Sequence, residues 1–320
     1  MKNDILIIRN FNLGDIIVAI PAFKYIKKKF PNRNISLLTF NKLHNFDEYL
    51  SLINSDKKLL DEIIYINFQG LKNIYTNYKN FILLKKFNEI IYLQDEERPL
   101  YKRIRNYLLF NLINKKNNIK LFKNKKYDKT RNESFFLAQE IEKNLDYSNF
   151  LKNYHIKKKF LILNPKIQQK LRNIDNYITI SFGGESSPTN WSLSNWKLLI
   201  KYLSQYSNFK IVLVGNKNDY ILSKTLNYPT KFNTINLCGK TSIFDLCYII
   251  QNSKMHISND NGTMHLANIL RTKSVSLFNN HNPIGKWESI DKDSIKLTNK
   301  EGINKINIYK LFKNLKAAKL

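Results

Sequence analysis

The chain has 320 residues, of which 43% are hydrophobic, and its 53 Lys and Arg against 25 Asp and Glu give a net charge of +28. This length and hydrophobic content indicate a soluble globular protein with room for two domains, each with its own core. No apolar run reaches the roughly 20 residues of a membrane-spanning helix, and the N-terminal apolar segment is too short for a signal peptide. Two cysteines, Cys238 and Cys247, provide neither a disulfide framework nor a metal cluster. We therefore expect a cytoplasmic protein.

Strands and helices alternate through the first half of the chain. Apolar runs predict strands over 5–8, 35–40, 62–66, 89–93 and 119–122. A helix is predicted over 16–26, after a turn at 12–15, and Pro21 inside it predicts a kink or a late helix start. An amphipathic helix follows over 130–145. The basic, polar region 152–176 is interpreted as the end of the first domain and a linker.

Positive charge is concentrated in residues 98–131, which hold twelve Lys or Arg and one acidic residue. The first cations of this basic stretch are Arg98, Lys102, Arg103 and Arg105. Such a charge density suits an anionic partner such as nucleic acid, acidic lipid or a phosphorylated glycan. A solvated basic face without a partner is the alternative interpretation.

A second alternation begins at residue 177. The patterns predict strands over 177–182, 210–214 and 233–237, helices over 195–206, 219–226 and 242–251, and a helix in about the last 17 residues. Alternating strands and helices predict a parallel, doubly wound sheet. The fold class is therefore α/β with two domains, 1–165 and 166–320, and we expect a ligand in the cleft between them.

The most informative stretch is Ser258–Ala267, which reads as the turn between a strand and a helix. Free backbone N–H groups and the helix dipole favour a phosphate at such a turn. Gly262 lets the backbone approach a bulky anion, and His265 can donate a hydrogen bond. Asp260 can cap the helix and fix the loop. In the alternative interpretation, Asp260 is only a cap and His265 a packed surface residue.

Three segments together resemble the family of bacterial lipopolysaccharide heptosyltransferases. They are residues 14–22 with Phe30-Pro31 behind them, residues 181–196, and residues 258–287. The resemblance implies two Rossmann-like domains facing across a cleft, the GT-B arrangement of glycosyltransferases. The N-terminal domain would bind the acceptor and the C-terminal domain the nucleotide-sugar donor, with the last helix packing back on the first domain.

The family's functional residues carry over onto matching positions. Asp15 is implied to be the catalytic base of an inverting single displacement, taking the proton of the acceptor hydroxyl; without the resemblance it reads as a helix cap. The implied diphosphate loop, with Asp260, Asn261, Gly262 and His265, would stabilise charge on the leaving group. The other implied donor-binding residues are Ser181, Gly183, Thr189 and, at the ribose hydroxyls, Asp219.

The chain departs from the family at Thr189, where a Lys usually helps to neutralise the diphosphate. Donor binding then needs another cation such as Lys286 or Lys240. Trp191 and Trp196 are interpreted as packing residues, and 291–293 as a polar loop despite its D-x-D pattern. The resemblance implies no metal and no cofactor.

The function expected from the resemblance is transfer of heptose from ADP-heptose to an inner-core lipopolysaccharide acceptor. The basic stretch would hold this anionic, lipid-linked glycan at the cytoplasmic face of the inner membrane, where the protein would be peripheral. We expect a monomer and no nucleic-acid partner. The alternatives are another nucleotide sugar, an inactive relative, and a basic protein that binds nucleic acid or an anionic surface. A dinucleotide oxidoreductase is disfavoured because the first turn lacks G-x-G-x-x-G.

Overall fold

The computed structural model describes residues 4–9, 12–40, 45–66, 82, 84, 86–93, 119–121, 132–162, 164–183, 190–206, 208–226, 234–279, 285–291, 294–307, 309, 311 and 313. The chain divides into two compact units. The first unit comprises Met1–Asp128 and Glu133–Tyr154, and the second comprises Lys129–Asn132 and His155–Leu320. The chain thus leaves the first unit after Tyr154, whereas the sequence predicts the domain boundary between residues 165 and 166.

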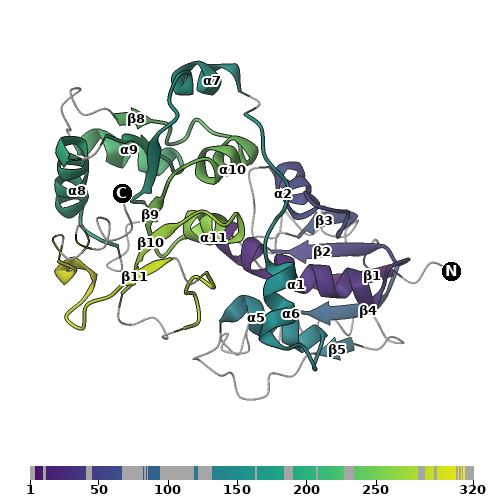
Figure 1. The fold of residues 1–320 in the computed structure, drawn as a ribbon. Helices are drawn as coiled ribbons and strands as arrows, with labels where there is room; N and C mark the ends of the chain where they lie inside the picture. The colour runs from purple at the N-terminus through teal and green to yellow at the C-terminus, as the bar shows by residue number, and fades with distance from the viewer. Residues whose placement is uncertain are drawn as a thin grey trace, which may run out of the picture. The chain divides into compact units, whose positions relative to one another are not determined.

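The first unit is built on a parallel sheet with the strand order β3-β2-β1-β4-β5 (Figure 1). All five predicted strands are confirmed; they are β1 (Asp4–Ile8), β2 (Ile35–Thr39), β3 (Glu62–Tyr65), β4 (Phe87–Tyr92) and β5 (Ile119–Leu121). The chain builds outward from β1 to β3 and then crosses to β4 on the other side of β1. In such sheets, ligands bind beyond the carboxyl ends of the strands at this reversal of order.

Helix α1 (Leu13–Lys29) is the central helix of the first unit. It begins eight residues before Pro21, so a late start is wrong: the residues from Ile16 to Phe23 are all buried, and this burial favours helix through the proline. The predicted helix over 130–145 is observed as α5 (Glu133–Ile141), and a separate helix, α6 (Tyr147–Tyr154), follows it. Both pack against α1, and the Ser134 hydroxyl donates to the Val18 carbonyl at 2.6 Å.

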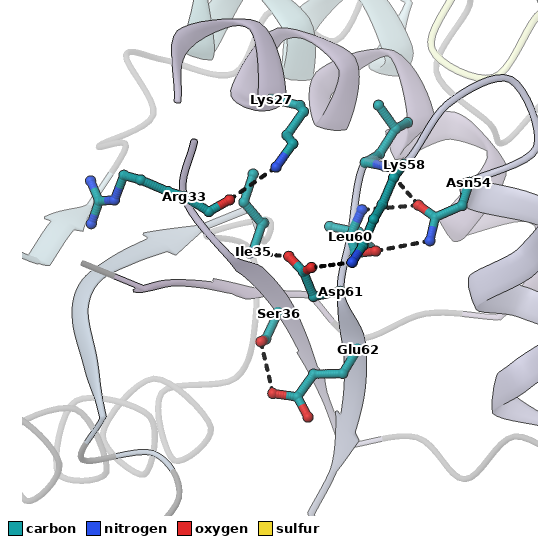
Figure 2. Close-up of polar contacts among 10 residues, drawn as sticks. Lys27, Arg33, Ile35, Ser36, Asn54, Lys58, Leu60, Asp61 and Glu62 are labelled. Carbon is teal, nitrogen blue, oxygen red and sulfur yellow. Dashed lines mark hydrogen bonds and ion pairs between the residues drawn. The ribbon is translucent and has the colours of Figure 1, made fainter. Parts of the chain in front are cut away.

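Polar side chains hold the amino ends of β2 and β3 together (Figure 2). The Asp61 carboxylate accepts from the Ile35 N–H at 2.8 Å and pairs with the Lys58 ammonium at 2.6 Å. Burial alone raises the pKa of Asp61, but Lys58 and the Ile35 N–H outweigh it and hold the pKa below its ordinary value. The neighbouring turn is closed by Asn54, which follows α2 (Phe46–Ile53) and accepts from the Leu60 N–H at 2.9 Å. This cluster fixes the strand ends opposite to those where a ligand is expected.

The second unit contains a parallel six-stranded sheet with the order β11-β10-β9-β6-β7-β8 (Figure 1). Its strands are β6 (Tyr177–Ser181), β7 (Lys210–Leu213), β8 (Thr234–Asn236), β9 (His256–Asn259), β10 (Ser274–Leu277) and β11 (Ile295–Leu297). The strand order reverses between β6 and β9. Two parallel, doubly wound sheets confirm the α/β fold class with two Rossmann-like domains.

The predicted helices of the second unit are observed as α8 (Leu193–Tyr206), α9 (Lys217–Thr225), α10 (Ile243–Gln251) and α11 (Gly262–Ile269). The region interpreted as a linker contains a further helix, α7 (Pro165–Leu171). The proline occupies the first helical position, where its missing N–H costs nothing, and the Asn164 side chain caps the helix by accepting from the Lys166 N–H. The first unit does end inside this region, at Tyr154, as expected, but the residues that follow it are partly helical and belong to the second unit.

The core of the second unit contains both predicted packing tryptophans. Trp191 and Trp196 are buried with ring centroids 5.0 Å apart, which confirms their packing role. Ile306 and Leu311 belong to the same core, while most of the predicted C-terminal helix lies outside the described residues. Cys238 and Cys247 are buried and unbonded, and burial raises the pKa of the Cys238 thiol to about 12. In the described part of the chain, no helix has the length and apolarity to cross a bilayer.

Candidate functional site

Two asparagines join the loops that follow β6 and β9, at the carboxyl ends of neighbouring strands. Asn259, the last residue of β9, donates from Nδ2 to the Phe182 carbonyl at 3.0 Å and accepts at Oδ1 from the Trp191 N–H at 3.3 Å. Asn261 donates from Nδ2 to the Gly183 carbonyl at 3.1 Å and to Ser181 Oγ at 3.3 Å. The structure therefore brings together Ser181, Gly183 and Asn261, three of the predicted donor-binding residues.

Asn261, and not Asp260, caps helix α11. Its Oδ1 accepts from the N–H groups of Thr263 and Met264 at 3.0 and 3.3 Å. The Asp260 N–H still pairs with the Leu277 carbonyl, which extends the β9–β10 ladder by one residue. The helix begins only after this residue, so the expected cap at Asp260 is wrong. Gly262 is the first helical residue and directly follows the cap. A phosphate at this turn stays a prediction.

The loop after β6 needs a glycine at 183. A Cβ on Gly183 would lie 1.2 Å from Asp219 Oδ1, which excludes any side chain unless Asp219 moves. Asp219 itself is 4% exposed, and its Oδ2 accepts from the Asn216 N–H at 2.6 Å in a capping box of α9. The carboxylate is thus placed between the loops after β6 and β7. Contact with the ribose of a nucleotide stays a prediction.

His265 lies one turn into α11 and packs against the loop that follows β10. Its ring meets Trp287 edge-on at 5.9 Å between centroids, and Lys286 Nζ lies 4.9 Å from the centroid of the same indole. Lys286 is 8% exposed, which is unusual for a lysine. Lys240, by contrast, is exposed and donates to the Asn236 carbonyl at the β8 end of the sheet. Of the two lysines, Lys286 is the one linked to His265 through a shared ring.

In the first unit, Asp15 lies at the amino end of α1, beyond the carboxyl end of β1. Its Oδ2 accepts from the Asn12 N–H at 3.0 Å, so it closes the first turn of the helix as the cap interpretation expects. Arg9 supports this turn: Nε donates to the Asp15 carbonyl at 3.2 Å and Nη1 to the Leu93 carbonyl at 2.9 Å. Glu133 completes the arrangement, with Oε1 3.8 Å from Arg9 Nη2.

Three of these residues, Arg9, Glu133 and Asn259, have no role in the sequence-based prediction, and neither has His256, which is buried at the start of β9. Arg9 is the one with a local signal, because a buried cation at the end of an apolar strand needs a partner. Other predicted residues lie outside the described part of the chain, namely Thr189, Arg98, Lys102, Arg103 and Arg105. Asp291 pairs with His155 at 3.3 Å. Among the described residues, no three His, Cys, Asp or Glu side chains are grouped to hold a metal ion.

Residues 113–314 match the model of a family described as glycosyltransferase family 9 (heptosyltransferase). The chain is 26% identical over 273 residues to a lipooligosaccharide heptosyltransferase 2 of Campylobacter jejuni, covering 83% of this chain and 78% of the relative. It is similar in fold to a family 9 glycosyltransferase of Veillonella parvula, with a TM-score of 0.75, 16% identity, and coverage of 99% of this chain and 97% of the other. It is also similar to the E. coli heptosyltransferase WaaC determined with ADP, with a TM-score of 0.66, 16% identity, and coverage of 98% and 99%.

Proposed function

The chain belongs to glycosyltransferase family 9 and is a glycosyltransferase, and from this premise we propose that it transfers heptose from ADP-heptose to an inner-core lipopolysaccharide. The main support for this donor site is that the Asn261 side chain hydrogen-bonds to Ser181 and Gly183 and so joins the β6 and β9 loops. A similar protein was determined with ADP, which supports an adenosine nucleotide. The C. jejuni relatives, as lipooligosaccharide heptosyltransferases, support the sugar and the acceptor class.

The donor diphosphate is proposed to lie against the amino end of α11. There the helix dipole favours negative charge, and Gly262 allows close approach of the backbone. His265 supplies a hydrogen bond one turn into the helix. The Asn261 side chain accepts from the N–H groups of Thr263 and Met264, so these two amides do not bind phosphate. The contribution of Asn261 is to fix the loop.

Lys286 is proposed to supply the positive charge that Thr189 lacks. Its ammonium lies over the Trp287 ring, and that ring makes a T-shaped contact with His265, so the lysine and the histidine both pack against one indole. Burial of Lys286 and the contact of its ammonium with Trp287 order the side chain before a donor arrives, which lowers the entropy cost of binding.

In the proposed reaction, an acceptor hydroxyl oxygen attacks the anomeric carbon of the heptose and the bond from that carbon to the diphosphate breaks. ADP leaves with the bonding electron pair, and its charge is stabilised by α11, His265 and Lys286. The hydroxyl proton passes to the Asp15 carboxylate. Attack opposite to the leaving group inverts the anomeric configuration.

Calorimetric titration with ADP, UDP, GDP and NAD tests the donor assignment. We expect saturable binding of ADP, and a dissociation constant about 10- to 100-fold higher in His265→Ala and in Lys286→Ala, since each removes a charge-assisted contact. Lys240→Ala is the matched control and should leave the affinity unchanged. Preference for UDP or GDP would move the proposal to another sugar, and no binding of any nucleotide would favour an inactive relative.

The basic stretch 98–131 is proposed to draw the protein to the anionic membrane face that carries the acceptor, with about 1 kcal/mol per cation near the surface. Neutralising Arg98, Lys102, Arg103 and Arg105 together to Gln should weaken sedimentation with anionic vesicles and leave ADP binding unchanged. Equal sedimentation of the variant and the unmodified protein would contradict a membrane role for these cations. A raised salt concentration should weaken vesicle binding of the unmodified protein.

A further inference from the structure

Among the buried titratable side chains of the second unit that the proposed function leaves unused, His256 lies nearest to the proposed donor loops. His256 is 0% exposed at the start of β9, and both of its ring nitrogens have hydroxyl neighbours. Nδ1 lies 2.9 Å from Thr179 Oγ1 of β6, and Nε2 lies 2.9 Å from Thr263 Oγ1 of α11. The imidazole therefore connects the strand that precedes one loop of the donor site to the helix that follows the other.

The hydrogen bonds determine which nitrogen carries the proton. Asn261 Oδ1 already faces the helix, because it accepts from two backbone N–H groups. Thr263 Oγ1 lies 2.7 Å from that oxygen, a distance that requires the hydroxyl hydrogen between them. Thr263 has then no hydrogen left for the histidine, so Nε2–H must donate to Thr263 Oγ1. Nδ1 is consequently bare. The Thr179 hydroxyl has three acceptors in reach, and it donates to the nearest, Nδ1 at 2.9 Å, rather than to Ser253 Oγ at 3.1 Å or the Met255 carbonyl at 3.4 Å.

The relay thus runs in one direction, from Thr179 through His256 and Thr263 to Asn261. Burial keeps the ring neutral by lowering the pKa of His256 to about 3, so the relay holds at physiological pH. Its far end is Asn261, which is only partly buried and whose Nδ2 holds Ser181 Oγ and the Gly183 carbonyl. Asn261 Oδ1 accepts from two backbone N–H groups and from the Thr263 hydroxyl, and these three bonds prevent the amide from flipping. A flipped amide would point its oxygen at the Gly183 carbonyl, and the two oxygens would repel each other.

We propose that His256 is a positioning residue of the donor site, which acts through Thr263 to fix the amide of Asn261 and so the spacing of the β6 and β9 loops. This inference rests on the proposed function, in which those loops hold the donor diphosphate. His256 touches no reacting atom. It keeps the β6 and β9 loops at their binding distance before the nucleotide arrives, and this preorganisation lowers the dissociation constant of the nucleotide.

The experiment compares Thr263→Val, Thr263→Ser and a matched control, Thr272→Val. Thr272 is also buried, and its hydroxyl donates to the Ile250 carbonyl, away from both loops. Thr263→Val should raise the ADP dissociation constant about 3- to 10-fold, whereas Thr263→Ser should change it by less than about twofold. Thr272→Val should lower the thermal unfolding midpoint and leave ADP affinity unchanged. A second route is His256→Leu, whose effect on affinity should not add to that of Thr263→Val.

NMR of the ligand-free protein labelled with ¹⁵N-histidine provides a readout that needs no nucleotide. We expect one neutral imidazole with its proton on Nε2 and with chemical shifts that move in Thr263→Val. A proton on Nδ1, or a Thr263→Val variant that loses stability but binds ADP normally, would overturn the positioning role alone. If the unmodified protein binds none of the nucleotides, the proposed function fails and the positioning role fails with it.

Discussion

Replacing Asp15 with asparagine should lower kcat about 10²- to 10⁴-fold, the usual effect of removing a general base. Asparagine has the same shape and keeps an oxygen that can accept from the Asn12 N–H, so the first turn of α1 stays capped. It cannot accept the proton of the acceptor hydroxyl. Transfer rates with saturating ADP-heptose and acceptor measure the change, and calorimetry should give an ADP affinity within about twofold of the unmodified protein.

The cap interpretation of Asp15 makes a different prediction, so the two can be separated. If Asp15 serves only α1, Asp15→Asn should resemble Asp47→Asn, a change in the first turn of α2 at an exposed position of the same unit. Both variants would then keep nearly normal kcat. Glu133→Gln is informative beside them, because it weakens the pair with Arg9, which supports the Asp15 turn, without touching the carboxylate itself. A smaller loss of kcat is expected for it than for Asp15→Asn.

The fold was predictable from the sequence wherever burial of an element gives it a run or a periodic pattern of apolar residues. The strands of the first unit are short apolar runs because they are covered on both faces, as the fully buried β2 shows. Two elements lacked that signal. Helix α7 presents mostly Lys and Gln to solvent and begins at a proline, which reads as a breaker unless the asparagine before it is recognised as a cap. Strand β11 carries the same Ile-Lys-Leu run as the predicted strand β5, so a run this short indicates a strand only once its partner, β10, is known.

The sequence predicted the strand, the turn and the helix of the candidate site, and the structure confirms these elements, but the hydrogen bonds of the site were not predictable. A strand, a turn and a helix in Ser258–Ala267 are sufficient to predict a phosphate-facing turn. The choice of Asn261 over Asp260 as the cap depends on how far the β9–β10 ladder extends, which is a tertiary property. His256 and the pair Arg9–Glu133 join segments that are distant in the chain, so their partners appear only in the folded protein.

Replacing Trp196 with alanine should lower the free energy of unfolding of the second unit by about 3–5 kcal/mol, the range for truncating a fully buried aromatic side chain. Trp196 is 0% exposed, and its ring lies 5.0 Å from Trp191 and 6.4 Å from Phe182 between centroids. Leu198→Ala on the same helix is the matched control, because Leu198 is 53% exposed and should cost less than about 0.5 kcal/mol.

Urea unfolding followed by tryptophan fluorescence measures this loss in the second unit, since all three tryptophans, Trp191, Trp196 and Trp287, belong to it. Phe182 directly precedes Gly183, so the cavity left by Trp196→Ala should also loosen the β6 loop and weaken ADP binding under conditions where the variant is still folded. A cost below about 1 kcal/mol would contradict the central packing role of Trp196. Full destabilisation with unchanged ADP affinity would instead show that the loop is held by Asn259 and Asn261 without help from the core beneath it.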